Sequence, residues 1–147
     1  MESPAGAISY VINHDVKPSE LASLYDNSGL LRPRDAATIS RMIDNANLII
    51  AARANRRLIG IIRAFTDFSH ACHVSDFAVE RKYLRMGVGE RMLQIIREAV
   101  GGKVVIFFMS SSEFDSFHSG MGLQKEEHVW SILGKDCFVS ANGAKKS

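Results

Sequence analysis

Residues 79–93 read VERKYLRMGVGERML and join an apolar strand to an amphipathic helix through a basic turn. Because Gly87 and Gly89 carry no side chain, backbone N–H groups in this turn can approach a bound group closely. The first turn of the helix adds unpaired N–H donors and the positive end of the helix dipole. The turn and the start of the helix also carry four basic residues: Arg81, Lys82, Arg85 and Arg91. The segment therefore predicts an anion site, with phosphate as the expected ligand.

The pattern on either side fixes where these glycines lie. Residues 71–79 have the character of a strand. Beyond the glycines, apolar residues recur at helical spacing until Gly101 and Gly102 stop the helix. The apolar stripe consists of Val88, Met92, Ile95, Ile96 and Ala99. Two common nucleotide motifs are excluded, because the Walker Gly-Lys-Ser/Thr is absent and no third glycine completes a dinucleotide fingerprint.

The spacing of Val79, Tyr83, Gly87 and Gly89 resembles the signature of the GNAT superfamily of N-acetyltransferases, Gln/Arg-x-x-Gly-x-Gly/Ala after a strand. Arg81 stands where the family commonly has Pro, and Leu84 stands where it has Gln or Arg. The family holds the cofactor pyrophosphate mainly through backbone amides, which any residue supplies. The departure at Leu84 therefore predicts weakened rather than lost cofactor binding.

A second match lies downstream, where residues 117–123 read FHSGMGL and resemble the family's Phe-Tyr-x-x-x-Gly-Phe element, with His118 in place of Tyr. The resemblance covers about residues 8–133. It implies an α/β fold, the GNAT fold, with a mixed, partly splayed sheet and helices on both faces. We expect one acetyltransferase domain over residues 1–140 and a flexible tail over residues 141–147.

The resemblance also implies acetyl-CoA as cosubstrate. Its pantetheine arm is expected along the strand that ends at Val79, and its pyrophosphate on the amides of the glycine turn. The expected cofactor-binding residues are Phe77, Ala78, Val79, Leu84, Arg85, Met86, Gly87, Val88, Gly89 and Glu90.

Acetyl transfer to an amine needs a proton acceptor, because an alkylammonium with a pKa near 10.4 is only about one part in 2,500 neutral at pH 7. His73 lies where family members carry a Glu or His base, and His70 is close by. Asp76 matches an aspartate of a subgroup resembling aralkylamine-type or uncharacterised bacterial amine acetyltransferases. It could orient a histidine or receive the substrate ammonium. His118 is the expected acid for the departing thiolate, since imidazolium is a donor near neutral pH.

Composition describes one ordinary globular domain of 147 residues, with 46% hydrophobic and 23% charged residues. The net charge of +2 is too small to indicate nucleic acid as a partner, and no apolar stretch approaches the roughly 20 residues of a membrane span. Two cysteines without CxxC spacing favour a reducing, cytoplasmic compartment. Five scattered histidines do not predict a metal site. A homodimer is possible, by resemblance to the family.

The remaining pattern predicts a strand, two helices, three strands, a helix, a strand, a helix and further strands. The expected strands are residues 8–12, 48–54, 58–65, 71–79, 104–109 and 124–133. The expected helices are residues 19–25, capped by Ser19, residues 35–45, capped by Asp35, and residues 88–99 and 112–121. Because residues 104–109 are wholly apolar, we expect that strand to be buried on both faces.

Together these features predict an N-acetyltransferase that moves acetyl from acetyl-CoA to a primary amine by direct attack in a ternary complex. The alternatives are a longer acyl-CoA and a non-catalytic acyl-CoA-binding or regulatory module, for which Leu84 and His118 are the hints. The acceptor stays open among small amines, aminoglycosides, polyamines, amino acids and protein N-termini. Residues 65–73, the two early helices and Trp130 are the expected acceptor region.

Overall fold

The computed structural model of the chain describes residues 7–110 and 114–135. These fall into two compact units, one ending at Phe108 and the other beginning at Met109. Ser111, Ser112, Cys137 and the predicted tail over residues 141–147 lie outside the described residues. The first unit contains the sheet and three of the helices, and it holds most of the residues predicted for the site.

Five strands form one sheet in the order β1-β2-β3-β4-β5. Neighbours from β1 to β4 are antiparallel, whereas β5 runs parallel to β4, so the predicted mixed sheet is confirmed. The strands are β1 (Ile8–Ile12), β2 (Leu48–Ala54), β3 (Arg57–Thr66), β4 (Ala71–Val79) and β5 (Val105–Phe107). The β2–β3 turn places Asn55 and Arg56 at φ 52° and 67°, as a tight hairpin of this hand requires.

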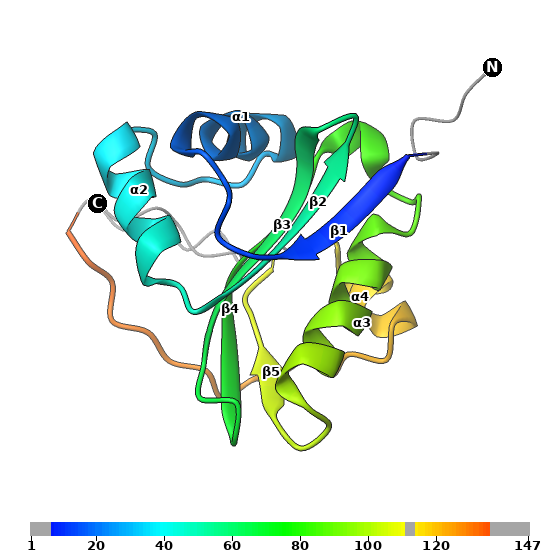
Figure 1. The fold of residues 1–147 in the computed structure, drawn as a ribbon. Helices are drawn as coiled ribbons and strands as arrows, with labels where there is room; N and C mark the ends of the chain where they lie inside the picture. Colours follow the sequence, from blue (N-terminus) through cyan, green and yellow to red (C-terminus); the bar gives the residue numbers. More distant parts are fainter. Residues whose placement is uncertain (1–6, 111–113, 136–147) are drawn as a thin grey trace. The chain divides into compact units, whose positions relative to one another are not determined.

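Helices cover both faces of this sheet, as predicted (Figure 1). Side chains of β2 alternate between two hydrophobic clusters: Ile50 and Ala52 face α3 (Val88–Val100), whereas Ile49 and Ala51 face the other helices. Those helices are α1 (Pro18–Ser28) and α2 (Ala36–Asn45). Because β2 is apolar on both faces, it is buried almost throughout.

A β-bulge interrupts the pairing of β3 with β4. Arg63 pairs with Asp76 and Ala64 pairs with Val74, so Ser75 is an extra residue on β4. On its other side β4 pairs with β5 only from Ala71 to His73. From Val74 to Val79 that edge of β4 carries no ladder to β5 among the described residues.

The helix boundaries follow local chemistry, with one correction. Asp35 caps α2 as predicted, because its carboxylate accepts a 3.0 Å hydrogen bond from the Thr38 amide. Ser19 does not cap α1: the N-cap is Lys17, whose amide donates to Glu20 at 2.9 Å. The helix begins earlier than predicted because Pro18, with its fixed φ and missing N–H, suits the first helical position.

Two strand predictions for the C-terminal third are wrong. The strand predicted over residues 104–109 shortens to β5. Val105 and Phe107 are 56% and 45% exposed, because among the three residues of β5 only Ile106 packs against the cluster that faces α3. In the second unit α4 (Asp115–Gly120) is shorter than predicted, and described residues 124–133 form no strand. Strand-like residues there have no partner strand in the described part of the chain, and Trp130 and Ile132 are 90% and 100% exposed.

Gly60 on β3 lets α3 approach the sheet closely. A Cβ there would lie 3.2 Å from Met92 Cε, 3.3 Å from Ala52 Cβ and 3.4 Å from Val88 Cγ1. Gly60→Val should therefore lower the free energy of unfolding by about 1–3 kcal/mol in chemical denaturation. Gly102→Val is the matched control, since nothing lies within 4 Å of its Cβ position, and it should change stability by less than about 0.5 kcal/mol. Equal effects of the two variants would contradict this packing.

Candidate functional site

The predicted anion site lies between β4 and α3. A short 3₁₀ helix, η1 (Arg81–Tyr83), follows β4, a turn that the sequence pattern did not predict. Arg85 and Gly87 then adopt left-handed conformations with φ of 67° and 83°, and Gly87 is the N-cap of α3. A non-glycine residue in this conformation costs roughly 1–2 kcal/mol, and such strain clusters at ligand sites.

The amides of this 84–90 loop are available to a ligand. The N–H groups of residues 85–90 donate to no acceptor among the described residues, whereas Leu84 bonds to Arg81 and Arg91 bonds to Gly87. Val88 is 1% exposed and packs in the core, so the start of α3 is held in place. Successive free amides at a helix N-terminus are the arrangement that binds phosphate groups.

The predicted cluster of four basic side chains does not form around this loop. The Arg81 guanidinium lies against Gly29 at the C-terminal end of α1. Lys82 pairs with Glu80 at 3.6 Å, and Arg91 donates to Gln94 at 3.2 Å. Arg85 is the exposed cation within the loop itself. The loop therefore offers an anion its backbone amides more than converging side chains.

The other residues predicted for the cofactor lie on this loop and on the end of β4 that precedes it. Leu84 and Met86 are 37% and 40% exposed, and Glu90 is exposed in the first turn of α3. On β4 the Phe77 ring meets Phe108 edge to face, with centroids 5.4 Å apart. The remaining predicted residues of β4 are Ala78, which is buried, and Val79, which pairs with Gly60. From Val74 to Val79 the β5-facing edge of β4 carries no ladder to β5.

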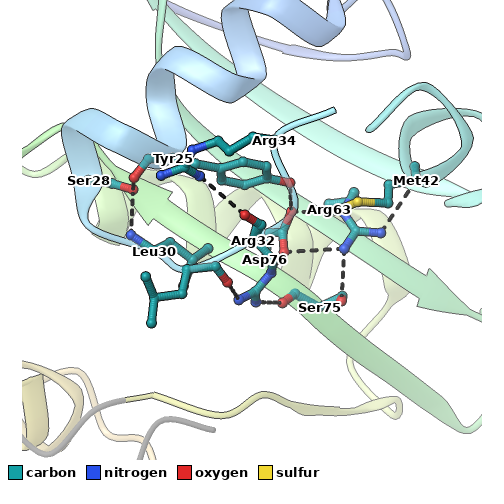
Figure 2. A network of polar contacts seen from close by, with 10 residues as sticks. Tyr25, Ser28, Leu30, Arg32, Arg34, Met42, Arg63, Ser75 and Asp76 are labelled. Carbon is teal, nitrogen blue, oxygen red and sulfur yellow. Dashed lines mark hydrogen bonds and ion pairs between the residues drawn. The ribbon is translucent and has the colours of Figure 1, made fainter. Parts of the chain in front are cut away.

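Asp76 is the centre of a buried polar network (Figure 2). Its Oδ2 accepts hydrogen bonds from Tyr25 Oη at 2.6 Å and Arg63 Nε at 2.8 Å. Its Oδ1 accepts from Arg32 Nε at 2.8 Å and Arg63 Nη2 at 3.2 Å. Arg32 and Arg63 also bind the bulge residue Ser75, at its carbonyl and its hydroxyl respectively. Four donors occupy the carboxylate, and none of them is a histidine.

Opposing influences act on the ionisation of this network. Burial raises the pKa of Asp76, but the hydrogen bonds and charges of Arg63 and Arg32 outweigh it and hold the pKa below 3.8. Burial and the Asp76 charge raise the pKa of Tyr25, so its hydroxyl stays protonated and donates. Two guanidinium groups and one carboxylate leave the cluster with one excess positive charge.

His73 lies apart from that network on the exposed part of β4. It pairs in register with Phe65 on β3 and Phe107 on β5, and its ring stacks on Phe107 with centroids 5.2 Å apart. Burial and then the charge of Arg63 lower the pKa of His73 below 6.5. At pH 7 the imidazole is therefore mainly neutral and able to accept a proton.

A hollow of about 450 Å³ opens beside His73. We call it the β3–β5 hollow, and its lining includes Asn45, Phe65, Asp67, His73 and Phe107. It coincides with the predicted acceptor region over residues 65–73. His118 lies in the second unit, on α4, where its Nε2 is 2.8 Å from Ser110 Oγ.

The motifs and periodicities of the sequence do not identify Tyr25, Arg32 and Arg63, which hold Asp76. One signal for Arg63 was available: a charged residue within the apolar run 58–65 must find a partner when buried. Nothing local marks Arg32 or Tyr25, because their partner is more than 40 residues away in the chain.

Comparisons with known proteins agree on one family. The model of the acetyltransferase (GNAT) domain matches residues 31–128. A Deinococcus radiodurans R1 protein proposed to be an acetyltransferase superposes with a TM-score of 0.75 at 18% identity, over 89% of this chain and 92% of that chain. A Staphylococcus aureus protein with the same proposed activity gives 0.74 at 17% identity, over 86% and 97%.

An aminoglycoside N-acetyltransferase in complex with CoA gives a TM-score of 0.66 at 15% identity, over 91% of this chain and 99% of that chain. At these low identities the TM-scores show a shared fold alone. A comparison with curated proteins finds no sequence match.

Asp76→Asn should be strongly destabilising, because it leaves two guanidinium groups without their counter-charge. We expect a loss of about 3–5 kcal/mol in the free energy of unfolding at pH 7. Since the folded pKa of Asp76 is lowered below 3.8, the stabilisation is present above pH 3.8 and is lost as pH falls through the folded pKa. The difference between wild type and variant should therefore shrink in acid.

Asp26→Asn is the control, because Asp26 pairs with Arg34 on the surface with a 62% exposed side chain. It should cost about 0–1 kcal/mol. Similar losses in the two variants would show that the network contributes no more than a surface ion pair.

Proposed function

Because this chain belongs to the GNAT acetyltransferase family, we propose that it transfers acetyl from acetyl-CoA to a primary amine by direct attack in a ternary complex. The family consists of acyl-CoA-dependent N-acetyltransferases, and acetyl-CoA is the cosubstrate. The observation that carries the proposal is the combination of a free-amide loop at one end of β4 with a neutral, exposed histidine at the other.

The 84–90 loop fits the diphosphate part of acetyl-CoA. Six consecutive amides, from Arg85 to Glu90, have no acceptor among the described residues, and the left-handed Gly87 turns them into the helix start. We propose that the pantetheine arm follows Phe77, Ala78 and Val79, where the edge of β4 has left β5. Backbone groups on this edge of β4 would hydrogen-bond the amides of the pantetheine arm, so no particular side chain is needed.

His73 is proposed as the proton acceptor, directly or through a water. His73 takes one proton from the bound ammonium, and the neutral amine attacks the thioester carbonyl. The C–S bond breaks, the thiolate leaves, and the remaining extra proton of the amide nitrogen passes to solvent. The lowered pKa of His73 favours this role at neutral pH, and the stack on Phe107 limits rotation of the ring. We propose His118 as the donor to the thiolate, with Ser110 fixing its ring.

Asp76 is proposed to assist His73 in accepting the proton, through its position and its charge. Its oxygens already accept four hydrogen bonds, so an incoming ammonium would have to displace a donor. Instead, the carboxylate holds Arg63, whose charge helps to lower the pKa of His73. We therefore infer that Asp76 positions Arg63 and does not bind the substrate directly.

Several finer expectations belong to the same proposal. The acceptor is a small amine or a protein amine, and Asp76 carries the resemblance to an aralkylamine-type or uncharacterised bacterial amine acetyltransferase. A cytoplasmic location and a homodimer are proposed on the sequence arguments above. Among the described residues no helix is long and apolar enough to cross a membrane.

Gly87→Glu and Gly89→Glu should weaken acetyl-CoA binding at least about tenfold in calorimetry. At either position the new side chain brings bulk and negative charge to the free amides, and at Gly87 it also strains a φ of 83°. Gly102→Glu adds the same charge at a position with open space and should leave the dissociation constant within about twofold. Unchanged affinity in both loop variants would rule out this loop as the pyrophosphate site.

His73→Gln should lower kcat/KM by about 10²-fold to 10⁴-fold at pH 7. The wild-type profile should rise along an acidic limb with an apparent pKa below 6.5, in the direction in which burial and Arg63 shift the pKa of His73. The defect should shrink as pH approaches the pKa of the amine, because the amine then arrives neutral.

His128→Gln, an exposed histidine of the second unit, is the control and should retain full activity. A loss in His73→Gln that is independent of pH would indicate a structural role. Full activity in that variant would move the base to another group, with His70 the next candidate.

A further inference from the structure

The β3–β5 hollow contains one ionised side chain, and it is acidic. Asp67 Oδ1 accepts the amides of Ser69, His70 and Ala71 at 2.8–3.1 Å, and these bonds lower its pKa to about 2. The carboxylate therefore stays negative at any working pH. Its second oxygen, Oδ2, has no partner among the described residues, and no lysine or arginine lines the hollow.

The other polar side chains of the lining are mostly occupied. Asn47 Nδ2 donates to the Thr66 carbonyl at 2.7 Å, and Asn47 Oδ1 accepts from the Thr66 amide at 2.9 Å. Asn45 uses its Nδ2 on the Arg41 carbonyl, which leaves its Oδ1 open. Each of these Nδ2 groups keeps a second N–H, so the lining offers neutral donors as well as acceptor oxygens. Its one charged side chain is Asp67, and the hollow therefore suits a ligand with positive charge.

Aromatic rings in the lining also favour a cationic ligand. Phe65 and Phe107 are 40% and 45% exposed on either side of His73. Ring faces attract cations and pack against methylene groups, and the Phe65 ring already takes the Arg63 guanidinium at 5.8 Å from its centroid. The donors of Arg63 are bound to Asp76, Ser75 and Met42, so this cation is not free to pair with a carboxylate on a ligand.

We propose that the acceptor is an aliphatic diamine, with one nitrogen at His73 and the other, as ammonium, at Asp67. The inference rests on the proposed role of His73 in acetyl transfer. The methylene chain lies along Phe65 and Phe107, and the distal ammonium donates to Asp67 Oδ2. The carboxylate disfavours acceptors that carry a carboxylate of their own.

The spacing sets the length of the diamine. The Asp67 amide bonds to the Ala71 carbonyl, so Asp67 lies opposite a residue two positions from His73. Two residues along a strand span about 7 Å, and adjacent strands lie about 4.8 Å apart. The two nitrogens of 1,4-diaminobutane are about 6 Å apart in the extended chain by standard bond lengths. The Cα atoms of Asp67 and His73 are therefore about 8.5 Å apart. We choose 1,4-diaminobutane as the probe, with its nitrogens meeting side chains that extend from both residues.

The test compares thiol release from acetyl-CoA with 1,4-diaminobutane, butylamine and 2-phenylethylamine at one pH and ionic strength. We expect kcat/KM for the diamine to exceed that for butylamine by about fivefold to tenfold. The advantage should shrink in 1 M salt, which screens exposed charges within about 3 Å.

Asp67→Asn keeps Oδ1 for the hairpin amides and removes the charge. It should abolish the advantage of the diamine through KM and leave butylamine within about twofold. Asp44→Asn is the matched control, since Asp44 is an exposed acid of α2 beside Asn45 that does not line the hollow. It should leave all three amines unchanged.

Calorimetry of 1,4-diaminobutane into the CoA-saturated protein separates this inference from the proposed function. Binding that Asp67→Asn weakens, without thiol release from any amine, would support the diamine site and contradict catalysis by His73. Thiol release with equal rates for butylamine and the diamine, insensitive to Asp67→Asn, would overturn the inference and leave the proposed function intact. A preference for 2-phenylethylamine that survives Asp67→Asn would also overturn it, in favour of apolar recognition.

Discussion

The buried carboxylate of Asp76 is the constraint on which the site depends. Its four hydrogen bonds tie β4 to Tyr25 of α1, to Arg32 of the connection after α1 and to Arg63 of β3. A charge this deeply buried is tolerated only when each oxygen is satisfied. The same cations also hold Ser75, so the network fixes the β-bulge together with the helices above it. Losing the carboxylate would release all of these elements at once.

The bulge in turn decides which side chains share a face of β4. Cys72 and Val74 pack with α3, and Phe77 and Val79 pack against the same cluster, although two residues separate the pairs where regular alternation would place one. The extra residue, Ser75, restores the alternation. As a result, His73 and Asp76 both lie on the side of α1 and α2. Without the bulge, Arg63 could not both bind Asp76 and lie close enough to His73 to affect its pKa.

The sequence predicted what local chemistry determines. Asp35 as a cap, the stripe of α3 and the glycine turn each depend on neighbours within a few residues, and each was confirmed. The predicted start of α1, Ser19, lies one residue after the observed start, Pro18, because both residue types are common at helix N-termini. The network around Asp76 could not be read in this way, since its members are brought together only by the fold. Residues 104–109 show a different limit, because an apolar run indicates burial only where neighbouring elements cover it.

The position of His73 resolves two requirements that usually conflict. A deeply buried histidine stays neutral but is out of reach of a substrate, whereas a fully exposed one is reachable but partly protonated near pH 6.5. His73 lies at the open end of the sheet, exposed enough to meet a ligand, yet flanked by Phe65 and Phe107 and close to the charge of Arg63. Burial and the charge of Arg63 lower its pKa, while the residue stays exposed. Arg32 and Arg63 together carry one positive charge more than Asp76 neutralises, and this charge lies beside the bulge. The buried hydrogen bonds to Asp76 stabilise it.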